Sequence, residues 1–423
     1  MLVLLGLSIV LICLSCSGAG GSSGGTTRTE HVYIAGGMGN TGDGPYPVFW
    51  KDGQLNQVEL TSGTYCSYIQ VSGGHVYIVG GNNANTPVHW IDGSRTTCSL
   101  GTYSGGYAKG LAVSGGDVYI SGFVSDGTND TPVYWKNGAL NVLTIGGSDN
   151  NSWIQGDNIV AVGGSIYVVA NTNLHSGTSY TGSTPKYWQV GSATPTALPL
   201  LSGFTDGEAA GATVSGNDWY VVGSNSGNGP AAPVYWKNGI LGSSLNVTIP
   251  YTHGFAKNIA IVGSTTYLVG EVSSDPTETT SVPAIWVNGT PTILSLPASV
   301  TGNACSFHLA VSGSTVYVAG TLVQSFWNTW IDNGTPLFWT VSGGSVTASA
   351  PAYGTEPQAK ISGMAMCGSD VWAPGTTGTL DANGNFVSGS PQHAGYWKNG
   401  VWSQLDIGSY AGSGAGGPFI SSE

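Results

Sequence analysis

Charged side chains are scarce in this sequence, and their scarcity excludes several kinds of partner. Only 8% of the 423 residues are charged, and 10 lysines and arginines stand against 22 aspartates and glutamates. A basic patch that would attract a phosphate backbone is missing, so no nucleic-acid partner is expected. The net charge of −12 favours solubility but identifies no ligand.

Helical periodicity and catalytic signatures are also missing after the N-terminal segment. No later segment repeats apolar residues at the spacing of an amphipathic helix, which excludes helical solenoids. Nothing has the spacing of an HExxH or a GxSxG motif, so we predict no catalytic residue, no metal and no cofactor. The 68 glycines stand beside 20 tyrosines and 14 tryptophans, which disordered chains lack. This combination favours short strands joined by tight turns.

The N-terminal segment has the pattern of an export signal. Residues 1–15 (MLVLLGLSIVLICLS) are too few to span a bilayer as an ordinary helix, and residues 17–27 form a Gly/Ser tether. An apolar core that ends in Leu14-Ser15-Cys16 resembles bacterial lipoprotein signals. The resemblance implies that Cys16 is the lipidated first residue and that a lipid anchor is the only membrane contact. It also implies a place in the cell envelope, at the outer membrane or cell surface. A cleaved secretion signal and an uncleaved anchor stay open as alternatives.

Four cysteines lie beyond this segment, and they fit no zinc-binding spacing. They are Cys66, Cys98, Cys305 and Cys367. An exported protein could pair them, but the repeat described next places them on different strands or near opposite strand ends, where neither pairing easily brings the Cα atoms within bridging range. We therefore expect buried thiols without disulfides.

One sequence unit recurs from residue 28 to the C-terminus. It is clearest as GLAVSGGDVYISG (110–122) followed by TPVYWKNGALNVLTIG (131–146). The first landmark is a tyrosine, replaced once by tryptophan, at Tyr33, Tyr77, Tyr119, Tyr167, Tyr220, Tyr267, Tyr317 and Trp372. The second is a tryptophan at Trp50, Trp90, Trp135, Trp188, Trp236, Trp286, Trp339 and Trp397. Because both recur in every unit, we interpret them as packing residues between repeats.

Each unit contains four strand-like runs. Glycine turns join the first two runs, and Asn-Gly or Asp-Gly turns join the last two. A meander of four strands every ~40–50 residues matches a propeller blade. We therefore predict a single all-β domain over residues 28–423, an eight-bladed β-propeller, with seven blades as the alternative. The array starts at a second strand, so the C-terminal segment around Ile420 is predicted to supply the first strand of blade one.

The repeat resembles the VYVAG…YWKNG proteins of bacterial envelopes, a propeller group similar in style to kelch and galactose-oxidase-like repeats. The quoted motifs stand here at residues 316–320 and 134–138. The resemblance covers residues 28–423 and implies the architecture. It implies no activity, because one fold hosts many functions.

Two sets of loops vary in length and are predicted to emerge on the same face of the propeller. They join the second strand to the third, and the fourth strand to the next unit. Variable loops on a rigid scaffold are common binding sites. The seventh unit's loop (321–336) carries Trp327, Trp330 and Asp332, which suit a sugar or a peptide. Aromatics that fold back over their own blade are the structural alternative.

Other loops of this face carry polar residues. The DANGN turn in the eighth unit's loop (376–391) is more simply a glycine turn than a calcium loop. The fourth unit's loop (171–185) is predicted to be solvated. Trp153, Asp206, Glu208, His253 and His308 are expected at the channel mouth. The two carboxylates are candidates for acid–base chemistry, and the two histidines for sharing a metal. Isolated polar residues around a water-filled channel explain the same pattern.

These observations favour a monomeric, non-catalytic envelope protein that binds a glycan or a protein through its loop-bearing face. An envelope glycan lyase or hydrolase, with its site at the channel mouth, is the alternative. A purely structural surface protein is the third hypothesis.

Overall fold

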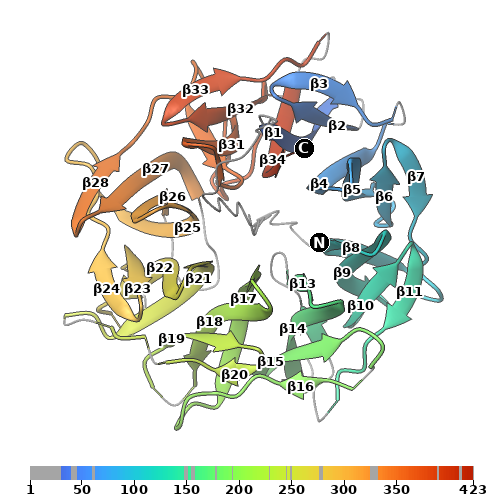
Figure 1. Ribbon diagram of the computed structural model, residues 1–423, viewed down its shortest axis with the longest axis horizontal. Helices are drawn as coiled ribbons and strands as arrows, with labels where there is room; N and C mark the ends of the chain where they lie inside the picture. Colours follow the sequence, from blue (N-terminus) through green and yellow to red (C-terminus); the bar gives the residue numbers. More distant parts are fainter. Residues whose placement is uncertain are drawn as a thin grey trace, which may run out of the picture.

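Eight antiparallel sheets stand around a central axis in the computed structural model of the chain (Figure 1). The structure describes residues 30–422 apart from residues 40–44, 60–61, 147–150, 154–157, 177–178, 193, 228, 244, 248–249, 276–279, 324–331, 388–389 and 409–411. Within these ranges no helix has the length and apolar character needed to cross a membrane. The predicted all-β propeller of eight blades is confirmed.

The two inner strands of each blade follow the predicted order. The innermost strands, from blade 1 to blade 8, are β34 (Gly412–Ser422), β4 (Thr64–Ser72), β8 (Gly105–Ser114), β12 (Asn151–Trp153) with β13 (Ile159–Val162), β17 (Asp206–Ser215), β21 (His253–Val262), β25 (Asn303–Ser312), and β29 (Gln358–Ile361) with β30 (Ala365–Cys367). The second strands are β1 (Glu30–Gly39), β5 (His75–Asn82), β9 (Asp117–Ser125), β14 (Ser165–Ser176), β18 (Asp218–Ser226), β22 (Thr265–Ser273), β26 (Thr315–Val323) and β31 (Asp370–Gly378).

The two outer strands complete each sheet. The third strands are β2 (Tyr46–Lys51), β6 (Pro87–Ile91), β10 (Asp130–Lys136), β15 (Ser179–Gln189), β19 (Ala232–Lys237), β23 (Val282–Val287), β27 (Asp332–Ser342) and β32 (His393–Lys398). The outermost strands are β3 (Gln54–Gln57), β7 (Ser94–Thr97), β11 (Ala139–Val142), β16 (Thr196–Ala197), β20 (Ile240–Leu241), β24 (Thr290–Ile293), β28 (Ser345–Ser349) and β33 (Val401–Gln404).

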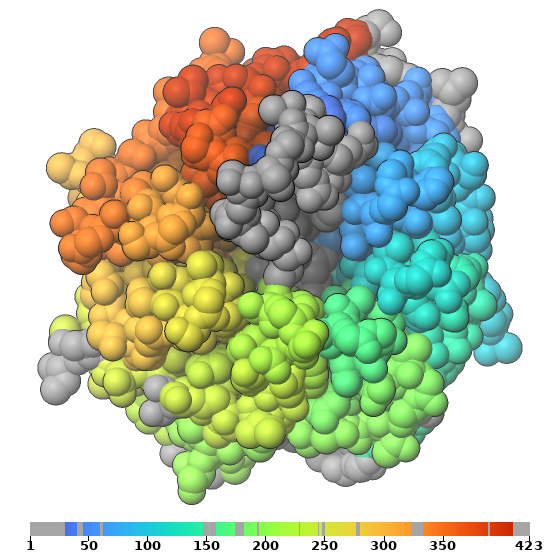
Figure 2. Space-filling view, viewed as in Figure 1, coloured from blue at the N-terminus to red at the C-terminus, as the bar shows by residue number. Residues whose placement is uncertain are grey.

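The C-terminal strand closes the ring. Strand β34 pairs antiparallel with β1, with Ile420 opposite Val32 and Phe419 opposite Tyr33. Blade 1 therefore contains both ends of the propeller, and the first and last blades adjoin in the space-filling view (Figure 2). The predicted closure around Ile420 is confirmed.

The turns adopt the geometry that their sequences predict. Asn137 and Gly138, between β10 and β11, have φ angles of 49° and 84°, the pattern of a type I′ hairpin turn. The same pair of left-handed residues recurs at residues 52–53, 92–93, 238–239, 288–289, 343–344 and 399–400. The side chain of Asn137 also accepts a hydrogen bond from Val118 N at 2.8 Å, which ties the turn to the second strand. One residue type thus satisfies both the backbone angle and a bond to the neighbouring strand.

A β-bulge bends the innermost strands. In blades 2, 3, 5, 6 and 7 one residue has no partner in the register: Ser67, Lys109, Ala210, Lys257 and Phe307. The backbone carbonyl two residues before the unpaired residue then packs directly against a glycine of the second strand. At Gly80, for example, an added Cβ would overlap the carbonyl oxygen of Tyr65. The glycine after the VYI landmark is therefore required by close backbone approach rather than by a turn.

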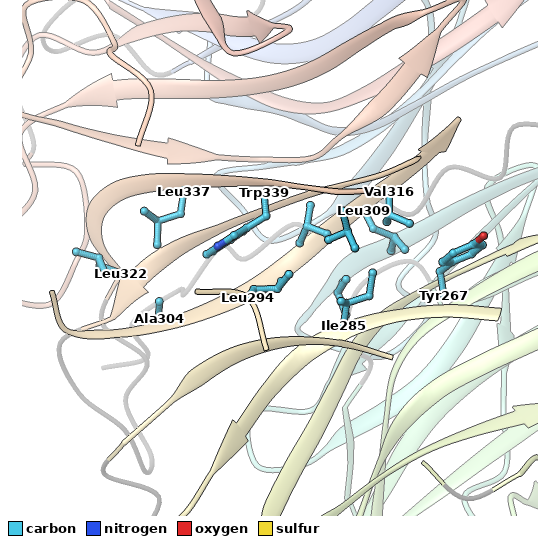
Figure 3. Close-up of a cluster of buried hydrophobic side chains, with 12 residues drawn as sticks. Tyr267, Ile285, Leu294, Ala304, Leu309, Val316, Leu322, Leu337 and Trp339 are labelled. Atoms are coloured by element: carbon cyan, nitrogen blue, oxygen red, sulfur yellow. The ribbon is translucent and has the colours of Figure 1, made fainter. Parts of the chain in front are cut away.

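The eight recurrent tryptophans join each blade to the one before it. All eight are buried, with exposed fractions of 0 to 1%. Trp135 Nε1 donates to the Ser99 carbonyl of the preceding blade at 2.7 Å, and Trp50 donates to Asp406 across the closure. Apolar side chains fill the remaining space, as between blades 6 and 7, where Leu294 and Trp339 lie in one cluster (Figure 3). The packing role inferred for these tryptophans is confirmed.

Two sequence-based details were wrong. The innermost strands of blades 4 and 8 are each divided into two short strands, and between the two parts the register shifts by three residues in blade 4 but by only one in blade 8. The loop predicted at residues 171–185 is instead an extension of the hairpin between β14 and β15, in which Asn171 pairs with Pro185. Asn171 and Thr172 are fully buried, so the first residues of this segment belong to the protein core and not to a solvated loop.

The cysteines of the described chain form no disulfide. Cys66, Cys98 and Cys305 are buried, and Cys367 is half-buried. Burial raises the pKa of the Cys66 thiol and holds the pKa of the Cys98 thiol at about 12. The prediction of buried thiols without disulfides is confirmed for the first three.

Candidate functional site

The two faces of the propeller differ in their connections. Two-residue turns define the turn face; they join first to second strands at residues such as 115–116 and 216–217, and third to fourth strands as described above. On the opposite face, which we call the loop face, connections differ widely in length, for example residues 83–86 in blade 2 and residues 379–392 in blade 8. The predicted asymmetry is present, and long loops collect on one face.

Charged side chains come together on blades 5 and 6, near the loop-face end of the innermost strands. Asp206 begins β17, and Glu208 lies two residues further on, so both project to the same side of the strand. Lys257 is the unpaired bulge residue of β21, and Glu271 lies opposite Phe255 on β22. We call Asp206, Glu208, Lys257 and Glu271 the rim cluster.

Lys257 and Glu271 form the buried part of the rim cluster. Lys257 Nζ lies 3.6 Å from Glu271 Oε1, and the two side chains are 21% and 1% exposed. No hydrogen bond reaches either Glu271 carboxylate oxygen from the described residues. Burial raises the pKa of the Glu271 carboxyl to about 7, and the Lys257 ammonium opposes that rise. Glu271 is therefore a carboxyl group close to its titration point at neutral pH.

Glu208 and Asp206 have different environments. Burial raises the pKa of the Glu208 carboxyl, Lys257 lowers it, and Asp206 adds to the rise. Asp206 is held by its neighbours, because its carboxylate accepts hydrogen bonds from Ser183 N of blade 4 at 3.1 Å and from Thr205 Oγ1 at 3.1 Å. The predicted carboxylates thus share one strand, where Asp206 anchors blade 4 and Glu208 lies beside Lys257.

Glu271 was not predicted from the sequence, although the repeat contains a signal for it. It stands four residues after the landmark aromatic, where the other units carry Gly37, Gly81, Phe123, Asn171, Ser224, Thr321 and Thr376. An ionisable residue occurs at this position in blade 6 alone. Comparison of the repeats position by position would have identified it.

The two predicted histidines lie at different depths. His253 begins β21 and lies opposite Ser273, whereas His308 follows the bulge of β25 and lies opposite Ala319. The β25 residue at the depth of His253 is Asn303, and the offset from there to His308 is about 15 Å of strand. The structure therefore does not bring the two imidazoles to one metal site. Burial lowers the pKa of His308 to about 4, so this imidazole is a neutral core residue at pH 7.

The remaining predicted residues are described only in part. Trp327 and Trp330 lie outside the described residues. Asp332 begins β27 opposite Val323, and Trp153 ends β12 opposite Asn171; the side chains of both lie outside the described part. Cys16 also lies outside it.

The DANGN segment of blade 8 is a turn. Asp381 Oδ1 accepts hydrogen bonds from Asn383 N at 2.8 Å and Asn385 N at 2.9 Å, so the carboxylate is used within the segment. Across the described ranges, no group of three or more His, Cys, Asp and Glu side chains is arranged to hold a metal ion.

No known protein family and no curated protein sequence matches this chain. Solved structures do match it. The dihydro-heme d1 dehydrogenase NirN, solved in complex with DHE, is 9% identical, and the match covers 92% of this chain and 74% of NirN with a TM-score of 0.50. Apo AztD from Citrobacter koseri is 9% identical over 94% of this chain and 99% of AztD, with a TM-score of 0.46. The β-propeller domain of the Trilobed protease from Pyrococcus furiosus is 10% identical over 76% of this chain and 95% of that domain, with a TM-score of 0.40. The likeness to NirN supports the propeller fold alone.

Proposed function

We propose that this chain is a non-catalytic binding protein of the bacterial cell envelope. It recognises a glycan or a protein through its loop face, and the rim cluster supplies polar contacts. The observation that carries the proposal is the Lys257–Glu271 pair, an ammonium and a carboxyl group largely withdrawn from water beside the long loops. Burial of a charged pair costs free energy that its own attraction only partly offsets.

The fold itself does not require this charge. In blade 4 the equivalent residue is Asn171, whose side chain donates to Ala209 O at 2.9 Å and accepts from Ala209 N at 2.8 Å, a bond pair that joins two blades. Glu271 makes no such bond to the described part of blade 7. Its carboxylate instead holds the Lys257 ammonium near Glu208. An ammonium beside a carboxylate offers donors and acceptors to sugar hydroxyls or peptide amides.

The envelope location rests on the N-terminal segment. A lipoprotein-like signal that ends at Cys16 would place the propeller on a lipid anchor, with residues 17–27 as the tether. Cys16→Ala is then expected to release the protein from the membrane fraction. Unchanged retention would refute lipid anchoring and favour an uncleaved anchor.

The binding proposal is tested with a glycan array and with chemical cross-linking of the full-length protein in envelope extracts. Lys257→Met and Glu208→Gln should each weaken capture of the recognised ligand by at least roughly tenfold, the cost of about one charged hydrogen bond. Lys136→Met is the matched control, because Lys136 pairs with Asp117 on the turn face. Trp327→Ala with Trp330→Ala tests the predicted aromatic contribution. Capture that survives the Lys257 and Glu208 changes would contradict the rim-cluster assignment.

A glycan hydrolase or lyase is the second candidate, because Glu208 and Glu271 have the raised pKa values of general acids. Glu271 is 1% exposed and Asp206 accepts a hydrogen bond from Ser183 N, so the half-buried Glu208 is the candidate acid of the cluster. Mass spectrometry of any captured glycan separates the two functions. Shortened or unsaturated products that disappear in Glu208→Gln would establish the enzyme.

A further inference from the structure

Each blade presents a pair of side chains to the next blade on the turn-face side of the interface. One member is the landmark aromatic of the second strand, and the other precedes the buried tryptophan of the third strand. In blade 4 the pair is Tyr167 and Tyr187, and in blade 7 it is Tyr317 and Phe338. We call this the interface pair.

Four blades cover the landmark ring with a lysine from their own third strand. Lys51, Lys136, Lys237 and Lys398 lie 4.9 to 5.6 Å from the ring centroids of Tyr33, Tyr119, Tyr220 and Trp372. These contacts are cation–π interactions that also shield the ring from water.

Blades 2, 4 and 6 use other covers. Ile91 and Val287 stand at the lysine position in blades 2 and 6, where they pack with Tyr77 and Tyr267 in the apolar clusters of those interfaces. In blade 4, Trp219 of the next blade fills the interface. Its ring stacks on Tyr167 at 4.9 Å and 21°, and meets Tyr187 edge-on at 4.9 Å.

Blade 7 has neither kind of cover. Thr340 stands at the lysine position, and Val371 of blade 8 stands where blade 5 has Trp219. The backbone at the two positions is held alike, since Trp219 N donates to Asn238 Oδ1 at 2.9 Å and Val371 N to Asn399 Oδ1 at 2.8 Å. The difference therefore lies in the side chains.

A cavity occupies the uncovered space. It measures about 390 Å³ and is lined by Tyr317, Phe338, Thr340, Val371, Asp370 and Asn399, among others. This volume lies within the roughly 300–1,000 Å³ of small-molecule sites. Aromatic side chains of both blades form part of the wall, and polar groups line the rest, among them Ser369, Asp370 and Asn399 at the turns of blade 8.

We propose that this cavity, between blades 7 and 8 on the turn face, binds a planar aromatic ring of indole size. The protein itself contains the template, because Trp219 occupies the equivalent space between blades 4 and 5 and stacks on the equivalent aromatic pair. The site lies on the opposite face from the rim cluster and is independent of the proposed function.

The charges around the cavity favour a neutral ring over a cationic ligand. Lys398 Nζ already lies 4.9 Å from the Trp372 ring and 2.7 Å from Asp370 Oδ2. Asn399 Nδ2 donates to the other Asp370 oxygen at 2.7 Å. A second cation would meet the Lys398 charge with the Asp370 carboxylate already paired, whereas a neutral ring gains stacking and edge-on contacts with the aromatic pair.

The experiment measures binding of N-acetyl-tryptophanamide to the full-length protein by NMR line broadening and calorimetry. A single site is expected. Val371→Trp reproduces blade 5 and should weaken binding at least tenfold, and Thr340→Lys should do the same through the cover used in four other blades. Gln189→Lys, the matched change in the already filled blade 4, should leave binding unaltered.

A reciprocal change makes the test stronger. Trp219→Val should open a second cavity and raise the stoichiometry from one ligand to two. A peptide with one tryptophan, compared with its alanine analogue, separates a protein-borne ring from a free small molecule. Absence of binding to the unaltered protein, equal binding by Val371→Trp and Thr340→Lys, or preference for N-acetyl-lysinamide would each overturn the proposal.

Discussion

Glu271 shows how one residue departs from the repeat around it. Seven units carry an uncharged residue four positions after the landmark aromatic, and blade 6 carries a carboxyl there that is 1% exposed. Its ion pair with Lys257 is long for a buried contact, at 3.6 Å. Removing the carboxyl from water therefore raises its pKa more than the ammonium lowers it.

Glu271 should make the stability of the protein depend on pH in an identifiable direction. Its folded-state pKa of about 7 lies above the ordinary glutamate value of 4.5, so between these values the folded state holds a proton that the unfolded state has lost. The free energy of unfolding then falls as pH rises through this window, by up to roughly 3 kcal/mol, and is flat above it. Glu271→Gln should abolish this decline, as measured by denaturant unfolding from pH 4.5 to 8.

Asp117 provides a control of opposite sign. Its hydrogen bond from Lys136 lowers the pKa of Asp117, so its contribution is present at neutral pH and is lost as pH falls through the lowered value. Asp117→Asn should leave the decline between pH 4.5 and 7 in place. A decline that persists unchanged in Glu271→Gln would show that another group causes it.

At the scale of the strand, the bulge and the glycine form one unit. The extra residue turns a carbonyl toward the second strand, and an alanine there would overlap that oxygen in blades 2, 3, 5, 6, 7 and 8. The unpaired residues themselves are as different as Ser67, Lys109 and Phe307. The bulge therefore has no sequence signature of its own, whereas the glycine that accommodates it recurs.

This coupling predicts a difference between two glycines in second strands. Gly80→Ala should destabilise the protein by roughly 2–4 kcal/mol, because the new Cβ meets the backbone carbonyl of Tyr65. Gly37→Ala should change stability by less than about 1 kcal/mol, since its Cβ would meet Pro45 at an ordinary 3.4 Å. Thermal and urea unfolding measure both. Equal losses would mean that the bulge adapts and that the glycine serves another purpose.

Elements were predictable where local chemistry determines them. Asn-Gly and Asp-Gly pairs predict the type I′ turns, because few residues adopt positive φ twice in succession. The hairpin extension at residues 171–185 was not predictable from its polar sequence, since its pairing depends on the neighbouring strand and on burial of Asn171. The rim cluster was predictable only in part. Asp206 and Glu208 follow a variable loop and were therefore predicted at the channel mouth, whereas Glu271 is buried on a second strand.

At the scale of the molecule, the ring is closed by strand pairing and by side chains together. Strand β1 belongs to the beginning of the chain and β34 to its end, yet they pair over nine Cα partners. The β1–β34 pairing lies within blade 1. The Trp50 side chain of blade 1 in addition donates a hydrogen bond to the Asp406 carbonyl of blade 8 at 2.7 Å, which joins the first blade to the last. The two halves of the closure are distinct, and they can be separated experimentally.

Removal of residues 412–423 should open the ring while leaving the Trp50 bond in place. Strand β1 would then expose a row of unpaired N–H and C=O groups beside its buried Val32 and Ile34, which favours pairing with another copy of the chain. The shortened protein should unfold at a lower temperature and form dimers or larger species in light scattering. A synthetic peptide of residues 412–423 should reverse the association and restore the melting temperature, because its sequence places Ile420 opposite Val32 in the β1 register, which a peptide of scrambled order would not do. A shortened protein whose molecular mass in solution and melting temperature match those of the full chain would show that the interfaces between blades, rather than the C-terminal strand, hold the ring closed.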